Sequence, residues 1–261
     1  MTDIDVVPAD IAAAIDAASS RLRGLAAPLV YVPTIGSTND AAASLATEGA
    51  VVVAGSQTAG RGRRGREWFS PPSSGLYVSV VLAPARASDP MRATTLLTLA
   101  AGVAIADGLA ASAGLAVDLK WPNDVFVSGR KLAGILAEAS RDIVVLGYGI
   151  NLRLMAYPPE LRDRVTSIEV ECGSPVDRAP VLVETLAALH YRYNELLEGR
   201  FDAILDAWRR RAPSAVGARV SWTDASGPRS GLTAGIDDRG ALLVATDGGV
   251  ARIVGGELDW S

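Results

Sequence analysis

Residues 117–152 form a run of apolar segments that are separated only by short turns. Pro122 breaks the run, the "SG" at 128–129 predicts a turn, and 142–152 continues the pattern as a further strand. Strands joined by such short turns pair as antiparallel hairpins. Because helical segments surround the run, we expect an α+β fold, in which a mixed, mostly antiparallel sheet carries helices on one face, rather than a doubly wound sheet.

Helices and further strands are predicted on both sides of this run. The helix over 37–49 is expected to be capped by Ser37 or Thr38 and to end at Gly49. The other expected helices cover 10–24, 90–114, 180–198 and 200–211, and the other expected strands cover 28–33, 50–55 and 76–83.

The pattern changes after Pro213, where short apolar runs alternate with turns rich in Gly and Asp. The turns include "DDRG" and "TDGG", and the apolar runs occupy 218–222, 231–236, 241–246 and 250–254. Short strands at this spacing predict a small β-barrel. We therefore expect two domains, which cover residues 1–212 and 213–261.

The composition limits the location and the partners of the chain. Its 261 residues carry a formal net charge of -4 and give a pI near 5.1, whereas nucleic-acid-binding domains are typically basic. Cys172 is the only cysteine, so neither a disulfide framework nor a Cys-based zinc site is expected. The N-terminus has no signal-peptide pattern, and no uninterrupted apolar stretch has the length of a membrane span. These features predict a cytoplasmic protein that binds neither DNA nor membranes.

The segment "GRGRRGREWFSPP" at 60–72, the arginine loop, places four arginines within six positions. Its G-x-G-x-x-G spacing formally matches the dinucleotide fingerprint, but that motif needs a helix directly after it, and here two prolines follow instead. Guanidinium groups bind phosphate through paired N–H donors. The segment therefore predicts a glycine-hinged loop that closes over a polyphosphate ligand.

The rare polar residues of the chain cluster in a few short segments. Only two of the 25 basic residues are lysines, Lys120 in "KWPND" and Lys131 in "GRKLAGIL", and Gln57 is the single glutamine. A lysine in an apolar strand is costly unless an anion pairs with it, so Lys131 is expected to meet a carboxylate or a phosphate. Further candidate polar residues in these segments and their neighbours are Ser37, Thr38, Asn39, Asn123, Asp124 and Asn151.

Five segments occur in an order that resembles the motif series of biotin protein ligases, the biotin–[acetyl-CoA-carboxylase] ligases. They span about residues 33–152 and read "STND", "SQTAGRGRRGREW", "KWPNDV", "GRKLAGIL" and "GYGINL". The resemblance implies a catalytic domain like that of class II aminoacyl-tRNA synthetases and an SH3-like C-terminal domain. It also implies an ATP-dependent ligase that forms biotinyl-5′-AMP and transfers biotin to a specific lysine of biotin carboxyl carrier domains of acyl-CoA carboxylases.

The resemblance assigns the polar residues to two sides of one site. Lys131 and Arg63 match catalytic positions, and Lys131 is expected to contact both the biotin carboxylate and the α-phosphate. The biotin side is expected to comprise Ser37, Thr38, Asn39, Gln57, Gly60, Arg61, Lys131 and Gly134. The ATP side is expected to comprise Arg63, Arg66, Trp68, Lys120, Asn123, Asp124 and Asn151. Mg²⁺ is expected to accompany ATP, and no residue is assigned to it.

Some biotin protein ligases carry an N-terminal helix-turn-helix domain and repress transcription, whereas only about 30 residues precede the first expected strand here. The chain is therefore expected to be a ligase without DNA binding, present as a monomer or a weak homodimer. Two alternatives remain open. A lipoate–protein ligase would share the fold and the adenylate chemistry. A non-catalytic RNA-binding adaptor would use the arginine loop for RNA and would leave Lys131 without a function.

Overall fold

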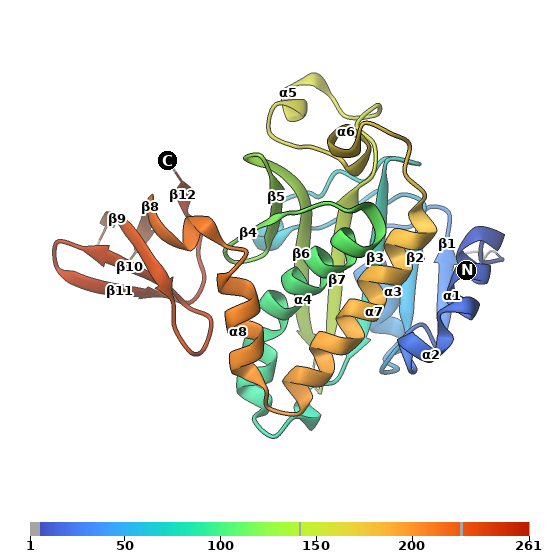
Figure 1. Cartoon of the computed structure of the whole chain (residues 1–261), viewed down its shortest axis with the longest axis horizontal. Helices are drawn as coiled ribbons and strands as arrows, with labels where there is room; N and C mark the ends of the chain where they lie inside the picture. Colours follow the sequence, from blue (N-terminus) through green and yellow to red (C-terminus); the bar gives the residue numbers. More distant parts are fainter. Residues whose placement is uncertain (1–5, 141, 225–226, 261) are drawn as a thin grey trace.

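A seven-stranded sheet lies at the centre of the computed structural model, which describes residues 6–140, 142–224 and 227–260 (Figure 1). Its strands are β1 (Leu29–Val32), β2 (Val51–Ala54), β3 (Gly75–Leu82), β4 (Asp118–Lys120), β5 (Asp124–Val127), β6 (Arg130–Ser140) and β7 (Ile143–Asn151). Their order across the sheet is β1-β2-β3-β7-β6-β5-β4. β1 and β2 pair in parallel, and the other neighbouring pairs are antiparallel. The expected mixed, mostly antiparallel sheet is confirmed.

Two long helices, α4 (Pro90–Ala113) and α7 (Arg178–Leu197), pack together against one face of this sheet, with α8 (Phe201–Arg209) beside them (Figure 1). The carboxylate of Asp89 caps α4 by accepting the backbone N–H of Arg92 at 3.0 Å, and α4 ends at Gly114 in the left-handed conformation. By length and hydropathy α4 could cross a membrane, but 67% of its most apolar window is buried inside the molecule. It is the central core helix of this fold.

The opposite face of the sheet carries α3 (Thr38–Leu45), which contacts β2, β3 and β7. Side chains alternate between the two faces along β7. The hydroxyl of Tyr148 lies 3.2 Å from Thr185 Oγ1 of α7, whereas the neighbouring Gly147 lies against Asn39 of α3. One face of β7 therefore belongs to the helical core, and the other is open to α3 and to the loops beside it.

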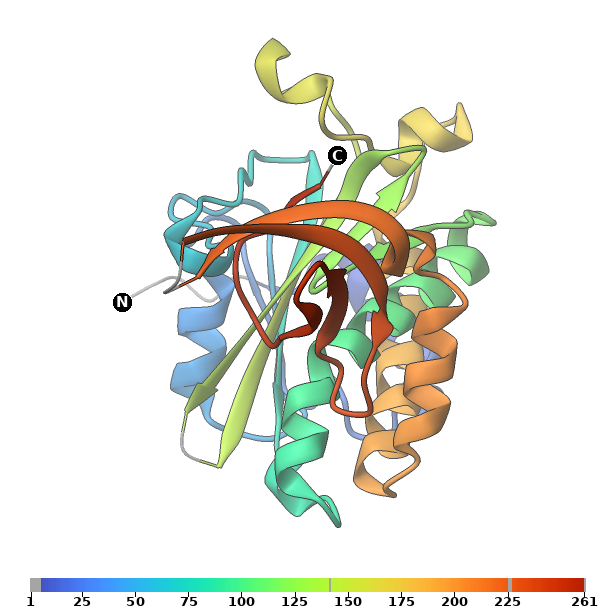
Figure 2. The same cartoon turned by 90° about the vertical axis from the view of Figure 1, so that its left-hand side faces the viewer.

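A second sheet of five strands forms the C-terminal part of the chain. Its strands are β8 (Val216–Asp224), β9 (Gly227–Ile236), β10 (Leu242–Thr246), β11 (Gly249–Ile253) and β12 (Asp259–Trp260). They pair in the order β11-β10-β9-β8-β12 and form a strongly curved sheet (Figure 2). Trp121 Nε1 donates to the carbonyl of Gly240 at 2.9 Å, which joins this sheet to the loop after β4. The SH3-like class and the boundary between residues 212 and 213 stay predictions.

The structure corrects the expected limits of α3. Ser37 stands at the N-cap position, but its side chain makes no capping hydrogen bond, and Thr38 is already the first helical residue. A tertiary partner replaces the cap, because Gln57 Oε1 accepts the backbone N–H of Thr38 at 2.9 Å. The helix ends at Leu45, four residues before Gly49, and the following Ala46 adopts the left-handed conformation. Helix propensity depends only on neighbouring residues, so it could not predict that Gln57, 19 residues away, would accept the N–H that a local cap normally accepts.

Several short elements differ from the expected ones. The single helix expected over 10–24 is divided into α1 (Ala9–Ala17) and α2 (Ser19–Leu22). The helices α5 (Pro159–Arg162) and α6 (Ile168–Cys172) and the strand β12 are not among the expected elements. Each has five residues or fewer, so its sequence is too short to show a helical or strand period.

The contact between α4 and α7 generates a prediction about two glycines of α4. A Cβ on Gly108 would stand 2.7 Å from the backbone and Cγ2 of Thr185, whereas a Cβ on Gly102 would meet Leu119 Cδ2 at 3.5 Å. We expect Gly108→Ala to lower the free energy of unfolding by about 2 kcal/mol, because the helices must move apart. Urea unfolding measures this change, and a variant as stable as the parent protein would contradict it.

Gly102→Ala is the matched control for this experiment. Alanine fits at that position in ordinary van der Waals contact with Leu119. Alanine also favours a helix over glycine by about 1 kcal/mol, so the free energy of unfolding should stay equal or rise slightly.

Candidate active site

Three glycines leave the α3 face of the sheet bare at the centre of the site. Gly134 of β6 pairs with Gly149 of β7, and Gly147 lies two residues away on the same face. A Cβ at Gly149 would stand 2.2 Å from Nε1 of Trp68, and a Cβ at Gly134 would stand 2.9 Å from the same indole. The indole therefore lies directly against the sheet backbone. Among the residues that the structure describes, its buried Nε1 has no hydrogen-bond partner.

The start of α3 and Gln57 form a polar wall at one end of the site. Ser37, Thr38 and Asn39 are all buried, with at most 5% of their surface exposed. Gln57 Oε1 accepts from the backbone N–H and the hydroxyl of Thr38 at 2.9 and 3.1 Å, and Gln57 Nε2 donates to Ser70 Oγ at 2.9 Å. The structure thus brings together the short polar residues that the sequence places on the biotin side.

Gly60, where the arginine loop begins, lies against this wall. A Cβ there would stand 2.5 Å from the carbonyl oxygen of Trp68 and 3.1 Å from Gln57 Nε2. The backbone N–H of Trp68 donates to the carbonyl of Gly60 at 2.9 Å, which closes the base of the loop. Only glycine permits this close approach, because any side chain at this position would collide with the returning strand.

Two carboxylates hold Arg61. Its guanidinium donates to both oxygens of Asp40 at 2.8 Å and to Glu138 Oε2 at 3.0 Å. The hydrogen bonds to Asp40 and Glu138 raise the pKa of Arg61, and the hydrogen bond from Arg61 lowers the pKa of Asp40. Glu138 Oε2 also accepts from Asn39 Nδ2 at 2.6 Å. Arg61 is therefore fixed beside α3, with its charge balanced by protein groups.

Lys131 meets a carboxylate, as its place in an apolar strand predicts. Its Nζ lies 2.7 Å from Asp124 Oδ1 and 5.3 Å from the centre of a Trp68 ring. The hairpin of β5 and β6 brings the two charges together, since Asp124 pairs with Gly134. An anionic ligand over Gly134 would compete with Asp124 for the Lys131 ammonium.

Lys120, the last residue of β4, lies close to two aromatic rings. Its Nζ is 4.9 Å from the ring centre of Phe126 and 5.0 Å from that of Trp260 in β12. Burial is the main cause that lowers the pKa of Lys120; Asp124 opposes this shift and Lys131 adds to it. A bound anion would stabilise the charged form of this lysine.

The arginine loop connects the two sheets. Arg63 Nη1 donates to Asn123 Oδ1 at 3.5 Å, and burial, with the nearby charge of Arg64, lowers the pKa of Arg63. Arg66 forms an ion pair with Glu257 of the C-terminal part. Because of these contacts, the loop lies between Asn123, in the loop after β4, and the segment that leads to β12.

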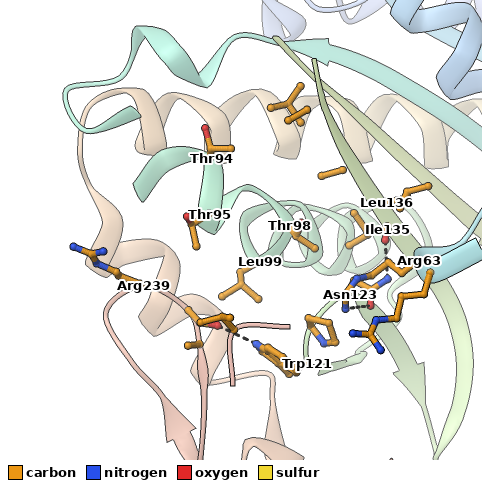
Figure 3. A pocket seen from close by; sticks show the side chains of 18 of the residues that line it. Arg63, Thr94, Thr95, Thr98, Leu99, Trp121, Asn123, Ile135, Leu136 and Arg239 are labelled. Atoms are coloured by element: carbon orange, nitrogen blue, oxygen red, sulfur yellow. Dashed lines mark hydrogen bonds between the residues drawn. The ribbon is translucent and has the colours of Figure 1, made fainter. Parts of the chain in front are cut away.

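A cavity of about 660 Å³ opens beside Arg63 and Asn123 (Figure 3). Asn123 is fixed within it, because its Nδ2 donates to the carbonyl of Ile135 at 2.7 Å. Threonines of α4, the far half of β6, the loop after β4 and residues of the C-terminal sheet and its loops also line the cavity. Of the residues that the resemblance assigns to the site, only Arg63 and Asn123 line this cavity, so it lies beside the loop after β4 rather than beside the polar wall.

Asn151 is placed differently from the other candidate residues. It is 1% exposed, and its Nδ2 donates to the carbonyl of Thr166 at 2.9 Å while its Oδ1 accepts from the hydroxyl of Tyr157 at 2.7 Å. Tyr157 packs edge-on against Phe69 at the end of the arginine loop, with ring centres 5.1 Å apart. Asn151 therefore holds the 157–166 segment, which also hydrogen-bonds with the backbone of Lys131.

Sequence reasoning missed several residues that complete the site. Asp40, Ser79 and Glu138 contact the predicted residues directly, and Gly147 makes room for Asn39, since a Cβ there would stand 2.2 Å from Asn39 Oδ1. A signal was present for two of them. Ser79 is a lone polar residue within "LYVSVVLA", and Glu138 is a lone acid within "LAGILAEAS".

Comparison with known proteins gives a consistent result. Residues 31–154 match the Biotin/lipoate A/B protein ligase family. The Bifunctional ligase/repressor BirA of Bacillus spizizenii is 36% identical over 242 residues, which cover 88% of this chain and 73% of that protein. The Biotin--[acetyl-CoA-carboxylase] ligase of Mycobacterium tuberculosis is 34% identical over 241 residues, which cover 88% of each chain.

A solved structure shows the same architecture. The biotin protein ligase from Aquifex aeolicus in complex with biotin and ATP has a TM-score of 0.77 and 29% sequence identity, and it covers 89% of this chain and 98% of its own. The match extends well beyond the motif segments. The chain therefore belongs to the biotin/lipoate A/B protein ligase family, among its biotin protein ligases.

Proposed function

We propose that this biotin protein ligase forms biotinyl-5′-AMP from biotin and ATP, and that it then transfers biotin to a lysine of the biotin carboxyl carrier domain of acyl-CoA carboxylases. The observation that carries the proposal is the arrangement of two groups on one bare stretch of sheet. The neutral donors and acceptors of Thr38 and Gln57 lie at one end, and the cations Lys131, Lys120 and Arg63 lie toward the other. A ligand with a polar head and an acidic tail, condensing with a polyphosphate, fits that arrangement.

The first step joins the biotin carboxylate to the α-phosphorus of ATP. A carboxylate oxygen forms the new P–O bond as the bond to pyrophosphate breaks, and the electrons leave with pyrophosphate. Negative charge builds up on the α-phosphate oxygens during this step, and a positioned cation stabilises it. Gly134, Gly147 and Gly149 together form the glycine floor of the site. Lys131 is the proposed cation, because its Nζ lies beside Gly134 and 2.7 Å from Asp124 Oδ1, a carboxylate that a ligand anion can replace. Arg63 is proposed to hold the phosphate from the arginine loop.

In the second step, the acceptor amine attacks the carbonyl of the mixed anhydride, and AMP leaves. The anhydride also reacts with water, so the site must exclude it between the two steps. The arginine loop and the 157–166 segment are proposed to do this, since Tyr157 joins them through its contact with Phe69. The cavity beside Arg63 and Asn123 is proposed to admit the acceptor lysine.

Magnesium is proposed to arrive with ATP rather than to occupy a site made by the protein alone. Among residues 6–140, 142–224 and 227–260, no group of three or more His, Cys, Asp or Glu side chains could hold a metal ion. Mg²⁺ commonly binds one or two carboxylates together with substrate phosphates. Asp124 would be the protein carboxylate that takes part, and phosphate oxygens and water would supply the other ligands.

Ligation without DNA binding is also proposed, for a monomer or a weak homodimer. The chain carries a net charge of -4, and its helices α1 and α2 contact α7 in the core. The division into a catalytic domain over 1–212 and an SH3-like domain over 213–261 belongs to the same proposal. A gel-shift assay that shows tight binding to a specific DNA operator would contradict the proposed absence of DNA binding.

A lipoate–protein ligase is the second candidate, because it would share the fold and the adenylate chemistry. The polar wall favours biotin. A ureido group offers N–H donors and a carbonyl acceptor, whereas the dithiolane of lipoate offers neither to Thr38 and Gln57. The RNA-binding alternative leaves the ion pair of Lys131 and Asp124 without a function.

Pyrophosphate exchange separates these candidates. The purified protein with Mg²⁺ and ATP should incorporate labelled pyrophosphate into ATP when biotin is present, and not with lipoate or without an acid. Transfer of labelled biotin to a carrier domain then tests the second step. Exchange with lipoate alone would identify lipoate, rather than biotin, as the substrate. Exchange with neither acid would reject the ligase mechanism for this chain.

Lys131→Ala should lower the rate of biotin-dependent exchange by about 10²–10³-fold, because one charge that stabilises the transition state is lost. The Asp124 oxygen that pairs with Lys131 is buried, so circular dichroism must first show that the variant is folded. Arg130→Ala is the matched control. Its side chain pairs with Glu171 at 2.9 Å outside the glycine floor, so the exchange rate should change little. Near-normal exchange in a folded Lys131→Ala protein would remove Lys131 from the catalytic step.

The lowered pKa of Lys120 predicts a pH dependence of ATP use. Lys120 binds phosphate only in its protonated form, so kcat/KM for ATP should fall as pH rises through its pKa in the free enzyme. That fall should begin below the pKa of an ordinary lysine, about 10.4, because burial favours the neutral form. Lys120→Arg remains charged and should move the fall to higher pH. An unmoved profile would show that another group controls it.

A further inference from the structure

The half-buried Lys120 differs from two other cations of the site in what surrounds its charge. Lys131 Nζ lies 2.7 Å from Asp124 Oδ1, and the guanidinium of Arg61 donates to two carboxylates. In the part of the chain that the structure describes, Lys120 forms no ion pair with a carboxylate. The charge of Lys120 is therefore available to an anionic ligand before any protein group has to move.

Two aromatic rings lie beside the Lys120 ammonium instead. Its Nζ is 4.9 Å from the ring centre of Phe126 and 5.0 Å from that of Trp260. Both distances are within the roughly 6 Å at which the face of an aromatic ring attracts a cation. A ring attracts the ammonium but carries no net charge. A phosphate can therefore approach Lys120 without displacing an anion.

The two rings belong to different sheets. Phe126 lies in β5, the antiparallel neighbour of β4. Trp260 lies in β12, where it pairs with Val220 of β8, a residue that is 0% exposed. The Trp260 ring also packs against the hydrophobic core, so both strand pairing and packing fix its position. The ammonium of Lys120 thus contacts one ring from each sheet.

Both neighbours of Lys120 in the chain are held by residues at or near the C-terminal sheet. The backbone N–H of Leu119 donates to the carbonyl of Arg211 at 2.6 Å, and Trp121 Nε1 donates to the carbonyl of Gly240 at 2.9 Å. These bonds fix the backbone at Lys120 and leave its long side chain as the variable part. A contact that restricts the rotamers of a lysine lowers the entropy that is lost when a ligand binds.

We propose that Trp260 is a positioning residue for ATP, whose ring holds the Lys120 ammonium, without neutralising it, where the phosphates of the nucleotide bind. The inference rests on the proposed ligase function and adds a residue of the C-terminal sheet to the nucleotide side. None of the residues that the resemblance assigns to the site belongs to that sheet. Trp260 acts through Lys120 and is not itself a catalytic residue.

Replacement of Trp260 by tryptophans with an increasing number of ring fluorines tests the proposal. Fluorine weakens the attraction of the ring for a cation and hardly changes its size. With biotin present, the Kd of α,β-methylene-ATP, an analogue that cannot release pyrophosphate, should rise steadily along the series to about fivefold. The Kd of biotin should change by less than about twofold. A constant Kd of the analogue along the series would overturn the proposal, because a role in packing alone does not depend on the charge distribution of the ring.

A double-mutant cycle shows whether Trp260 acts through Lys120. Trp260→Leu should raise the Kd of the analogue about fivefold, and Trp260→Phe, which keeps an aromatic face, should raise it less. In a Lys120→Met background the ammonium is absent, so adding Trp260→Leu should change this Kd by less than about twofold. Two independent, multiplicative losses would overturn the proposal. If Trp260→Leu does not fold, the fluorinated series, which keeps the shape of the ring, decides the question.

Trp222→Leu is the matched control, because Trp222 lies in β8 of the same sheet. Its ring centre is 5.8 Å from the guanidinium carbon of Arg229, a residue of β9 rather than of the nucleotide side. This variant should keep the Kd of the analogue within about twofold of that of the wild type. A rise equal to that of Trp260→Leu would show that any disturbance of the sheet weakens nucleotide binding, and it would reject a specific role of Trp260.

The wild-type protein separates the two levels of the argument. A wild type without biotin-dependent pyrophosphate exchange would reject the proposed function. Normal exchange in the wild type, together with a constant Kd along the fluorinated series, would reject only the role of Trp260.

Discussion

The close approach of side chains to bare sheet backbone at Gly134, Gly147 and Gly149 is the constraint on which the rest of the site depends. Without a Cβ at these positions, Trp68 and Asn39 reach the level of the strands themselves. The ligand-facing side of the sheet is therefore lined by backbone at these three positions. On the other face, Tyr148, between Gly147 and Gly149, contacts Thr185 of α7 in the helical core.

Charge balance is the second organising principle. Arg61 is paired with Asp40 and Glu138, and Lys131 is paired with Asp124, so the cations of the site are kept in place before a ligand arrives. Such pairs hold side chains in a working geometry and lower the cost of reorganisation during the reaction. The two pairs differ in use. The carboxylates around Arg61 lie at the α3 end, whereas Asp124 pairs with Lys131, the cation proposed to meet the substrate anions.

The strands of the sheet and most of the candidate polar residues could be predicted from the sequence. The contacts between residues far apart in the chain could not, because no local pattern encodes them. Hairpins, strand ends and the clustering of Lys120, Lys131 and Gln57 follow from local patterns that a single chain displays. The contacts of Glu138 with Asn39 and Arg61 join residues 77 or more positions apart, and no local period encodes them. The role of Asn151 as a support for the 157–166 segment likewise depends on Tyr157, which lies in an irregular stretch.

The contact of Trp260 with Lys120 has a consequence for how such a ligase can change over time. β12 pairs with β8, so the position of the Trp260 ring depends on the geometry of the C-terminal sheet. Substitutions in that sheet can thereby change the surroundings of Lys120, the residue proposed to bind the nucleotide, while leaving the Thr38 end of the site unchanged. Under the proposed function, substitutions could therefore change the binding of ATP and the binding of biotin independently of each other.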